Sequence, residues 1–166
     1  MKVLNKIAAD FDNTINHNAI LKNIRIENFE EFKKTGIPTS KEEFWKYTDP
    51  SIVNDSEFSL GIPNNFEDEN FDIIIVNGKI IGNNDIDEVT NIQIGLEQKI
   101  IKVSDFNKTS NPFINLNNAF LEEGCVINFR NNTEKEIKVL NIVDNTNSQQ
   151  IIHPRIVVKA GKNSNI

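Results

Sequence analysis

The first part of the chain repeats apolar residues at the spacing of an α-helix. Between residues 14 and 35 apolar residues recur at roughly helical spacing, and Glu residues alternate with Lys residues among them. The apolar residues of this stretch include Ile20, Leu21, Ile24, Ile26, Phe29 and Phe32. Gly36 and Pro38 follow, as is typical of a helix C-terminus. The pattern predicts a helix over 14–35 that ends at Gly36.

A second, shorter helix is expected directly after this one. Ser40 and Glu43 have the spacing of a capping box, in which each side chain bonds the backbone amide of the other residue. The predicted helix carries an aromatic cluster and ends before Pro50, because proline disfavours helix in the residue that precedes it. The cluster consists of Phe44, Trp45 and Tyr47.

From residue 72 the period changes to that of β-strands. Residues 72–76 and 79–81 are apolar runs on either side of Asn77-Gly78, a pair that suits a two-residue hairpin turn. Turn residues then separate further short apolar runs. These predict strands at 91–96, 99–103, 125–129, 137–143 and 152–159. A short helix is expected at 112–121, with Pro112 in its first position and Gly124 after its end.

These patterns divide the chain into three parts. Residues 1–53 form an N-terminal helical region, and 54–71 have no period and read as a surface linker. Residues 72–166 form a β domain with one inserted helix. The fold class is therefore α+β, and successive short strands without crossover helices indicate a sandwich, a barrel or a β-solenoid.

Composition narrows the possible functions. The chain has 166 residues and a net charge of -6, which argues against nucleic acid or an anionic membrane as a partner. No apolar run reaches the length of a membrane span. The single cysteine, Cys125, excludes an internal disulfide and a four-thiolate metal site within one copy. Cys125 opens an alternating strand, so we expect a buried thiol rather than a nucleophile.

One short motif suggests an enzyme. Asp10-Phe-Asp12-Asn-Thr14 resembles the DxDxT pattern of haloacid dehalogenase-type phosphatases, in which the first aspartate attacks phosphorus, the second is the general acid, and Mg²⁺ neutralises the phosphate. Such enzymes need a parallel sheet with helices between its strands, which the rest of the chain does not offer. The alternative interpretation is that these residues cap the first helix.

A second resemblance covers about residues 20–160. The segment from Gly36 through Pro38, Trp45 and Tyr47 to Thr48 is similar to a segment near the start of the SufD branch of the SufB/SufD family. Further blocks follow in the family's order. They are Arg25 in the first helix, Asn77-Gly78 in a strand and turn, Asn111 to Phe120 with Asn117 and then Gly124, and His153-Pro154-Arg155 before an apolar strand.

The resemblance implies a fold and a role. It implies a small helical region, then a β part that leads into the start of a right-handed parallel β-helix. The role would be that of a non-catalytic, cytoplasmic scaffold subunit of the SufBCD iron–sulfur cluster assembly complex, with SufB-like and SufC-like partners. The complex as a whole would handle the cluster, and the SufC-like ATPase would use the ATP. This chain would hold no cofactor and no metal.

The matched positions are expected to be architectural rather than catalytic. They serve as caps, turns and docking residues, with Trp45 as a buried docking residue. The chain stops where the family's β-helix begins to extend, so we expect an exposed sheet end near 152–166 and weak self-association. A free-standing adaptor that binds through Trp45 and Tyr47 remains a further possibility.

Overall fold

The computed structural model describes residues 2–17, 19, 21–56, 58–83, 90–94, 106–122, 124–144 and 149–166. The chain forms two compact units. The first, called here the helical unit, comprises Met1–Leu60 and Ile101–Glu122; the second, the β unit, comprises Gly61–Ile100 and Glu123–Ile166. The architecture is thus a mixture of α and β structure, as expected. The boundaries differ from the three-part division, because the inserted helix lies in the helical unit.

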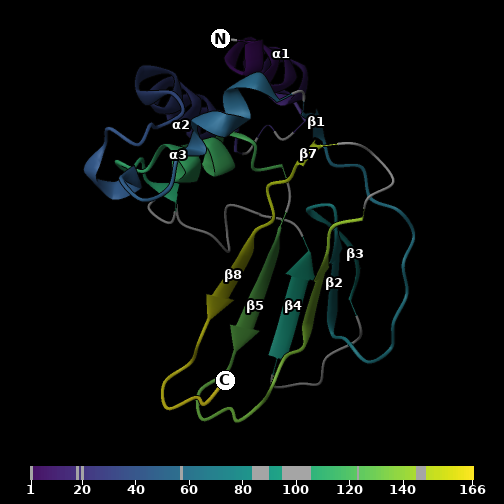
Figure 1. The fold of residues 1–166 in the computed structure, drawn as a ribbon. Coiled ribbons are helices and arrows are strands. Elements are labelled where there is room, and N and C mark those ends of the chain that lie inside the picture. Colours follow the sequence, from purple (N-terminus) through teal and green to yellow (C-terminus); the bar gives the residue numbers. More distant parts are fainter. Residues whose placement is uncertain are drawn as a thin grey trace. The chain divides into compact units, whose positions relative to one another are not determined.

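In the residues that the structure describes, the helical unit is built on three α-helices. They are α1 (Lys2–Thr14), α2 (Lys22–Thr35) and α3 (Pro112–Ala119). Figure 1 shows α3 against α2, although some eighty residues separate them in the chain. The predicted helix over 14–35 was too long at its start, since α1 ends at Thr14 and α2 begins only at Lys22. The sequence analysis missed α1, whose Val3, Ile7 and Phe11 are buried at helical spacing.

The expected second helix is reduced to short 3₁₀ turns. These are η1 (Glu43–Trp45) and η2 (Pro50–Asp55), and a two-residue strand, β1 (Ser59–Leu60), lies beyond them. The capping box predicted at Ser40 is not formed. One of the two bonds of such a box is formed one residue earlier in the chain, where the Glu42 carboxylate accepts from the Thr39 amide at 3.0 Å. The predicted linker at 54–71 is largely irregular, apart from the end of η2 and β1.

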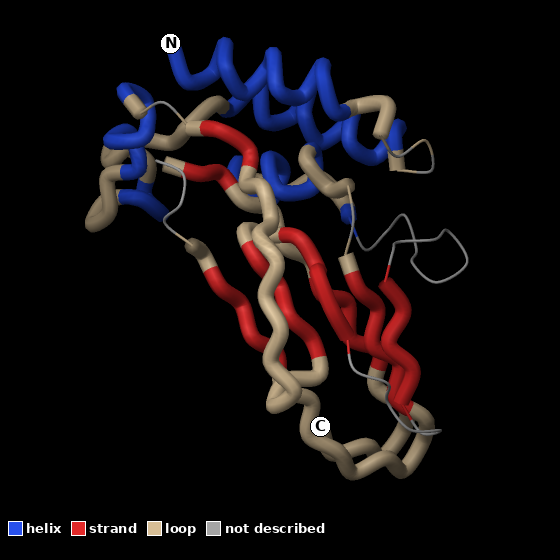
Figure 2. Tube along the Cα trace, turned by 90° about the vertical axis from the view of Figure 1, so that its right-hand side faces the viewer, coloured by secondary structure: helices blue, strands red, loops and turns tan. Residues whose placement is uncertain are grey.

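The described part of the β unit contains two three-stranded sheets. The first has the order β3-β2-β6, with β2 (Ile73–Val76), β3 (Lys79–Asn83) and β6 (Val139–Ile142). The second has the order β4-β5-β8, with β4 (Thr90–Ile94), β5 (Cys125–Phe129) and β8 (Ile156–Lys159). A short strand, β7 (Gln150–Ile151), precedes β8. Figure 2 shows these strands in red.

Most of the predicted strands are confirmed with small changes of boundary. The strand at 125–129 is β5, and the strands at 137–143 and 152–159 contain β6 and β8. The strand predicted at 91–96 begins at Thr90. The strand at 99–103 lies outside the described residues.

The hairpin predicted at Asn77-Gly78 is confirmed. Strand β2 pairs antiparallel with β3, and Val76 faces Lys79 across the turn. Asn77 has φ 49° and Gly78 has φ 83°, so both turn residues lie at the positive φ that a type I′ turn needs.

Two strand pairs are parallel, and their offsets differ: 31 residues in β5–β8 and 66 residues in β2–β6. In the pair β5–β8, each residue faces the residue 31 positions later: Cys125 faces Ile156, and Ile127 faces Val158. The bridge between Glu134 and Asn165 has the same offset. The pair β2–β6 is also parallel, with Ile73 opposite Val139. Strands β6 and β8 therefore lie beside β2 and β5. We call β2 and β5 the first layer and β6 and β8 the second layer.

The core of the β unit lies between the first-layer strands of the two sheets. Ile73 and Ile75 of β2 pack with Cys125, Ile127 and Phe129 of β5, and all five are buried. These residues alternate along their strands, so one face of each sheet is turned inward.

The end of α2 gives a testable prediction. Gly36 has φ 68° and ψ −161°, and an added Cβ would meet nothing within 4 Å. This backbone region is open essentially only to glycine. Gly36→Ala and Gly36→Asn should therefore each lower the free energy of unfolding by about 1–3 kcal/mol, as measured by urea denaturation. Ser40→Ala, at an exposed position, is the control. A Gly36→Asn variant as stable as the wild type would contradict the conclusion that residue 36 has a backbone conformation open essentially only to glycine.

Candidate functional site

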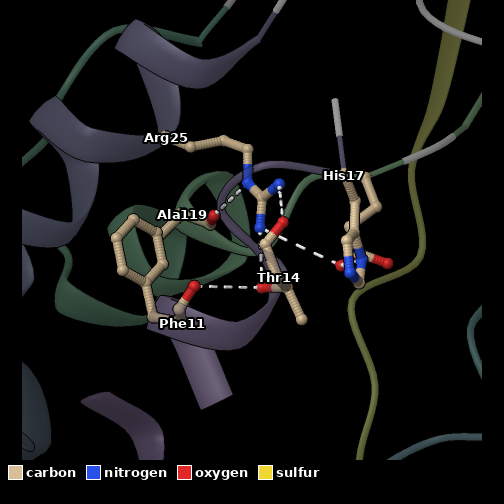
Figure 3. Close-up of polar contacts among 6 residues, drawn as sticks. Phe11, Thr14, His17, Arg25 and Ala119 are labelled. Atoms are coloured by element: carbon tan, nitrogen blue, oxygen red, sulfur yellow. Dashed lines mark hydrogen bonds and ion pairs between the residues drawn. The ribbon is translucent and has the colours of Figure 1, made fainter. Parts of the chain in front are cut away.

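A buried arginine organises the helical unit. Arg25 lies on α2, and its side chain is fully buried. Its Nε donates to the Ala119 carbonyl at 2.8 Å, and its two terminal nitrogens donate to the Thr14 carbonyl and the Thr14 hydroxyl, each at 2.8 Å. Figure 3 shows how these oxygens surround the guanidinium. One side chain thus joins the C-terminal ends of α1 and α3 to the first turn of α2.

Two further groups adjoin this guanidinium. Glu122 lies 4.0 Å from Arg25, and His17 Nδ1 lies 3.1 Å from the same carboxylate oxygen. Burial lowers the pKa of Arg25, and the Glu122 charge raises it in part. A guanidinium remains protonated in proteins, so a full positive charge is held inside the unit.

A second buried polar contact joins the same helices. Asn28 of α2 donates to the Ile24 carbonyl at 2.9 Å and to the Phe106 carbonyl at 3.1 Å. Its own side-chain oxygen accepts from Asn118 of α3 at 3.1 Å. Arg25 and Asn28 occupy the same face as Leu21, Ile24 and Phe29. In the sequence, Arg25 and Asn28 stand at helical spacing on an otherwise apolar face, and this is the signal that could have revealed the network. The helix was predicted from the apolar residues alone.

The aromatic motif residues divide into two groups. Trp45 is half-buried and packs edge-on against Phe113 of α3, with ring centroids 5.3 Å apart. The expectation that Trp45 is a buried docking residue is met only in part, because the side chain packs on Phe113 but keeps contact with solvent. Phe44 and Tyr47 are 98% and 93% exposed. Pro38, at the start of the motif, is buried.

Asn77 joins three segments of the β unit. Its side-chain nitrogen donates to the Ile62 carbonyl at 2.7 Å and to the Asp144 carboxylate at 2.9 Å. Its side-chain oxygen accepts from the Asp144 amide at 3.0 Å. Asn77 is buried, so these contacts satisfy an amide that water cannot reach.

The remaining matched positions also lie in structural surroundings. Asn117 is half-buried on α3, and Gly124 is buried just before β5. The backbone carbonyl of Arg155 accepts from the Cys125 amide at 3.1 Å. Burial lowers the pKa of the Arg155 side chain. His153, two residues earlier, is half-buried rather than at the surface.

The phosphatase motif lies on a helix rather than on a strand. Asp10 and Asp12 belong to α1, where side chains two residues apart point in different directions. Asp10 pairs with Lys6, and Thr14 is engaged by Arg25. These residues do not cap α2 either, because its N-cap is Leu21, which makes no side-chain capping bond. The two carboxylates cannot converge on one phosphate in this arrangement.

Other reactive candidates are similarly placed. Cys125 is buried in β5, as expected, and burial raises the pKa of its thiol from an ordinary 9.0 to about 11. Within the described part of the chain, no three His, Cys, Asp or Glu side chains gather where they could hold a metal ion. None of the described helices is both long and apolar enough to cross a membrane.

Part of the chain matches a known protein family. Residues 7–73 match the family model described as the SufBD protein N-terminal region. No curated protein matches the chain significantly. The match covers α1 from Ile7 onward, α2, the aromatic motif and the first residue of β2. It supports the SufB/SufD family, whose members take part in iron–sulfur cluster assembly, for this N-terminal part.

Arg25→Lys should destabilise the helical unit. An ammonium group on a flexible stem cannot reach all three oxygens at once, so buried acceptors would lose their donors. We expect a loss of about 2–4 kcal/mol in the free energy of unfolding, measured by denaturation. Arg130→Lys is the matched control, because Arg130 is exposed and should lose less than about 0.5 kcal/mol. Equal losses for the two variants would contradict the role given to Arg25.

Cys125 should be unreactive in the folded protein. A thiol-specific chromogenic reagent at pH 8 should label it only after unfolding, because burial disfavours the thiolate. The raised pKa also makes stability pH-dependent. The free energy of unfolding is unaffected by this thiol below about pH 9. It falls as the pH rises towards about 11, because the unfolded chain then loses the thiol proton more readily than the folded protein does.

The alkaline loss of stability has its own control. Cys125→Ala should lose less stability than the wild type between these two pH values, since other titrating groups are common to both. Rapid labelling of the native thiol would show that this part of the β unit is open.

Proposed function

We propose that this chain is a SufD-like, non-catalytic scaffold segment of an iron–sulfur cluster assembly complex. The observation that carries the proposal is the match of residues 7–73 to the SufBD N-terminal family model. The matched motif residues have structural roles in caps, turns and side-chain packing. Scaffold subunits need such rigid contacts, whereas an enzyme needs converging reactive groups.

The β unit adds support for the same family. The pairs β2–β6 and β5–β8 are parallel, and β5, β8 and the bridge at Glu134 share an offset of 31 residues. Parallel strands stacked at a constant offset are the elementary arrangement of a β-solenoid. This register favours the start of a parallel β-helix over the sandwich and the barrel.

The cluster chemistry and the ATP hydrolysis belong to the partners in this proposal. The chain has one cysteine, and its burial keeps the thiol protonated. A cluster needs several thiolate ligands. The cytoplasmic location and the absence of a cofactor from this chain are part of the same proposal.

A second candidate function is that of an adaptor. The nearly complete exposure of Phe44 and Tyr47 favours it, because large aromatic side chains are enriched at protein interfaces and are otherwise covered. An adaptor would use this aromatic surface for a partner outside the assembly complex.

Co-purification separates the two functions. The tagged chain, co-expressed with the SufB-like and SufC-like subunits of its source organism, should retain the SufB-like subunit through several washes. A double variant, Phe44→Ser with Tyr47→Ser, should leave this retention unchanged, since both side chains point into solvent. If the folded chain retains neither subunit, the scaffold function is wrong. If retention is lost only in the double variant, the aromatic surface carries the binding.

A further inference from the structure

The hairpin turn between β2 and β3 contains the single Asn-Gly pair of the sequence. An asparagine before glycine is chemically labile, because glycine has a freely rotating backbone and no side chain to block attack by its nitrogen. The glycine nitrogen bonds the side-chain carbonyl carbon and gives up its proton, and the side-chain nitrogen leaves as ammonia. Water then opens the resulting succinimide ring to aspartate or isoaspartate. At Asn77 the attacking atom is the backbone nitrogen of Gly78.

In the folded protein the Asn77 side chain is held in other contacts. Asn77 is 1% exposed. Its side-chain nitrogen donates to the Ile62 carbonyl at 2.7 Å and to the Asp144 carboxylate at 2.9 Å. Its side-chain oxygen accepts from the Asp144 amide at 3.0 Å. To meet the Gly78 nitrogen, the side-chain carbonyl carbon has to leave these partners. Ring closure therefore requires the buried contacts to break first.

The neighbouring segments also restrict the backbone of the turn. A Cβ added at Gly78 would lie 3.0 Å from the Ile152 Cβ and 3.1 Å from the His153 nitrogen. A Cβ added at Gly61 would lie 2.4 Å from the Asn77 carbonyl oxygen. Backbone from two other parts of the β unit thus packs closely on the turn. Rotation of the turn into the geometry of the succinimide ring would displace these segments.

Deamidation would reverse the electrostatics of the same contacts. A carboxylate at position 77 accepts hydrogen bonds but cannot donate them, so the Ile62 carbonyl and the Asp144 carboxylate would lose a donor. Two negative charges would then face each other where water does not reach, which disfavours the folded state. The other oxygen of the Asp144 carboxylate is already bonded by the Asn64 side chain. The deamidated chain therefore cannot rebuild the contacts of the original one.

We propose that Asn77 is a deamidation site that the folded β unit keeps closed, so that the modification marks chains whose β unit has opened. Water is the only co-reactant. The reaction is slow compared with opening and closing, so its rate follows the population of the open state. The loss of ammonia makes the mark irreversible, and the new carboxylate opposes return to the folded state. The inference does not depend on the proposed function.

Peptide mass spectrometry of the full chain tests the chemistry. The chain is incubated at pH 8 in buffer and in guanidinium chloride, and deamidation is followed at each asparagine. Asn77 should react fastest of all in guanidinium chloride and about tenfold or more slowly in buffer. Asn163, which is exposed and precedes the small residue Ser164, is the internal control, and its rate should change less. Gly78→Ala should slow the reaction in guanidinium chloride, where the loss of the turn has no effect.

Two results of this measurement would overturn the proposal. One is an equal rate at Asn77 in buffer and in guanidinium chloride, since the fold would then give no protection. The other is an unfolded chain in which Asn77 reacts no faster than Asn163. Neither result requires a variant to fold.

Substitutions test the consequence of the modification. Asn77→Asp reproduces one product, and the equilibrium constant for unfolding should rise about tenfold to a hundredfold, as measured by denaturation. Asn65→Asp, at an exposed position of the same unit, adds the same charge and should leave the constant unchanged. Combining Asp144→Asn with Asn77→Asp should recover part of the loss, because the new amide donates to the new carboxylate. An Asn77→Asp chain as stable as the wild type would overturn the proposal, as would a double variant no more stable than the single one.

Discussion

The guanidinium of Arg25 is the charge on which the helical unit depends. Removing such a group from water costs several kcal/mol unless nearby oxygens replace its solvent. Here the Thr14 carbonyl and hydroxyl and the Ala119 carbonyl do so, while Glu122 supplies the nearest opposite charge. These oxygens come from the ends of two helices, where backbone carbonyls lack partners within the helix. The requirement to satisfy one side chain therefore specifies where α1 and α3 end relative to α2.

The β unit is organised by backbone register instead. Parallel pairing at an offset of 31 residues places each residue of β8 beside its counterpart in β5. The turns after the two strands are equivalent as well: Asn132 and Asn163 stand 31 positions apart, both at positive φ. The Asn163 side chain donates to the Asn132 side chain at 3.3 Å. Repetition of this kind builds a core layer by layer.

These two constraints together explain why a structural role suits the chain. The polar side chains best placed for chemistry, Arg25, Asn28 and Asn77, are committed to contacts that hold segments together. The side chains with reactive potential are separated by helical geometry, as Asp10 and Asp12 are, or buried, as Cys125 is. Among the described residues, Phe44 and Tyr47 are the most exposed large apolar side chains.

The sequence by itself determined the local elements and part of the family assignment. Periodicity located α2, α3 and most strands, and Asn77-Gly78 and Gly36 identified a turn and a helix end because positive φ favours glycine and asparagine strongly. The motif around Trp45 pointed to the family that the comparison supports over residues 7–73. The helical register of Val3, Ile7 and Phe11 was also present in the sequence, although it was not used.

Only the tertiary structure decided which distant segments meet. Helix α3 joins the helical unit because Ala119 and Asn118 bond residues of α2 some ninety positions earlier, and no local pattern encodes that distance. The capping box at Ser40 failed because short-range propensities are weak against the packing of Trp45 on Phe113. Likewise, strand periodicity shows which face is apolar but not which strand lies beside it. The parallel pairing of β6 and β8 depends on long-range backbone hydrogen bonds, which exist only once the chain has folded.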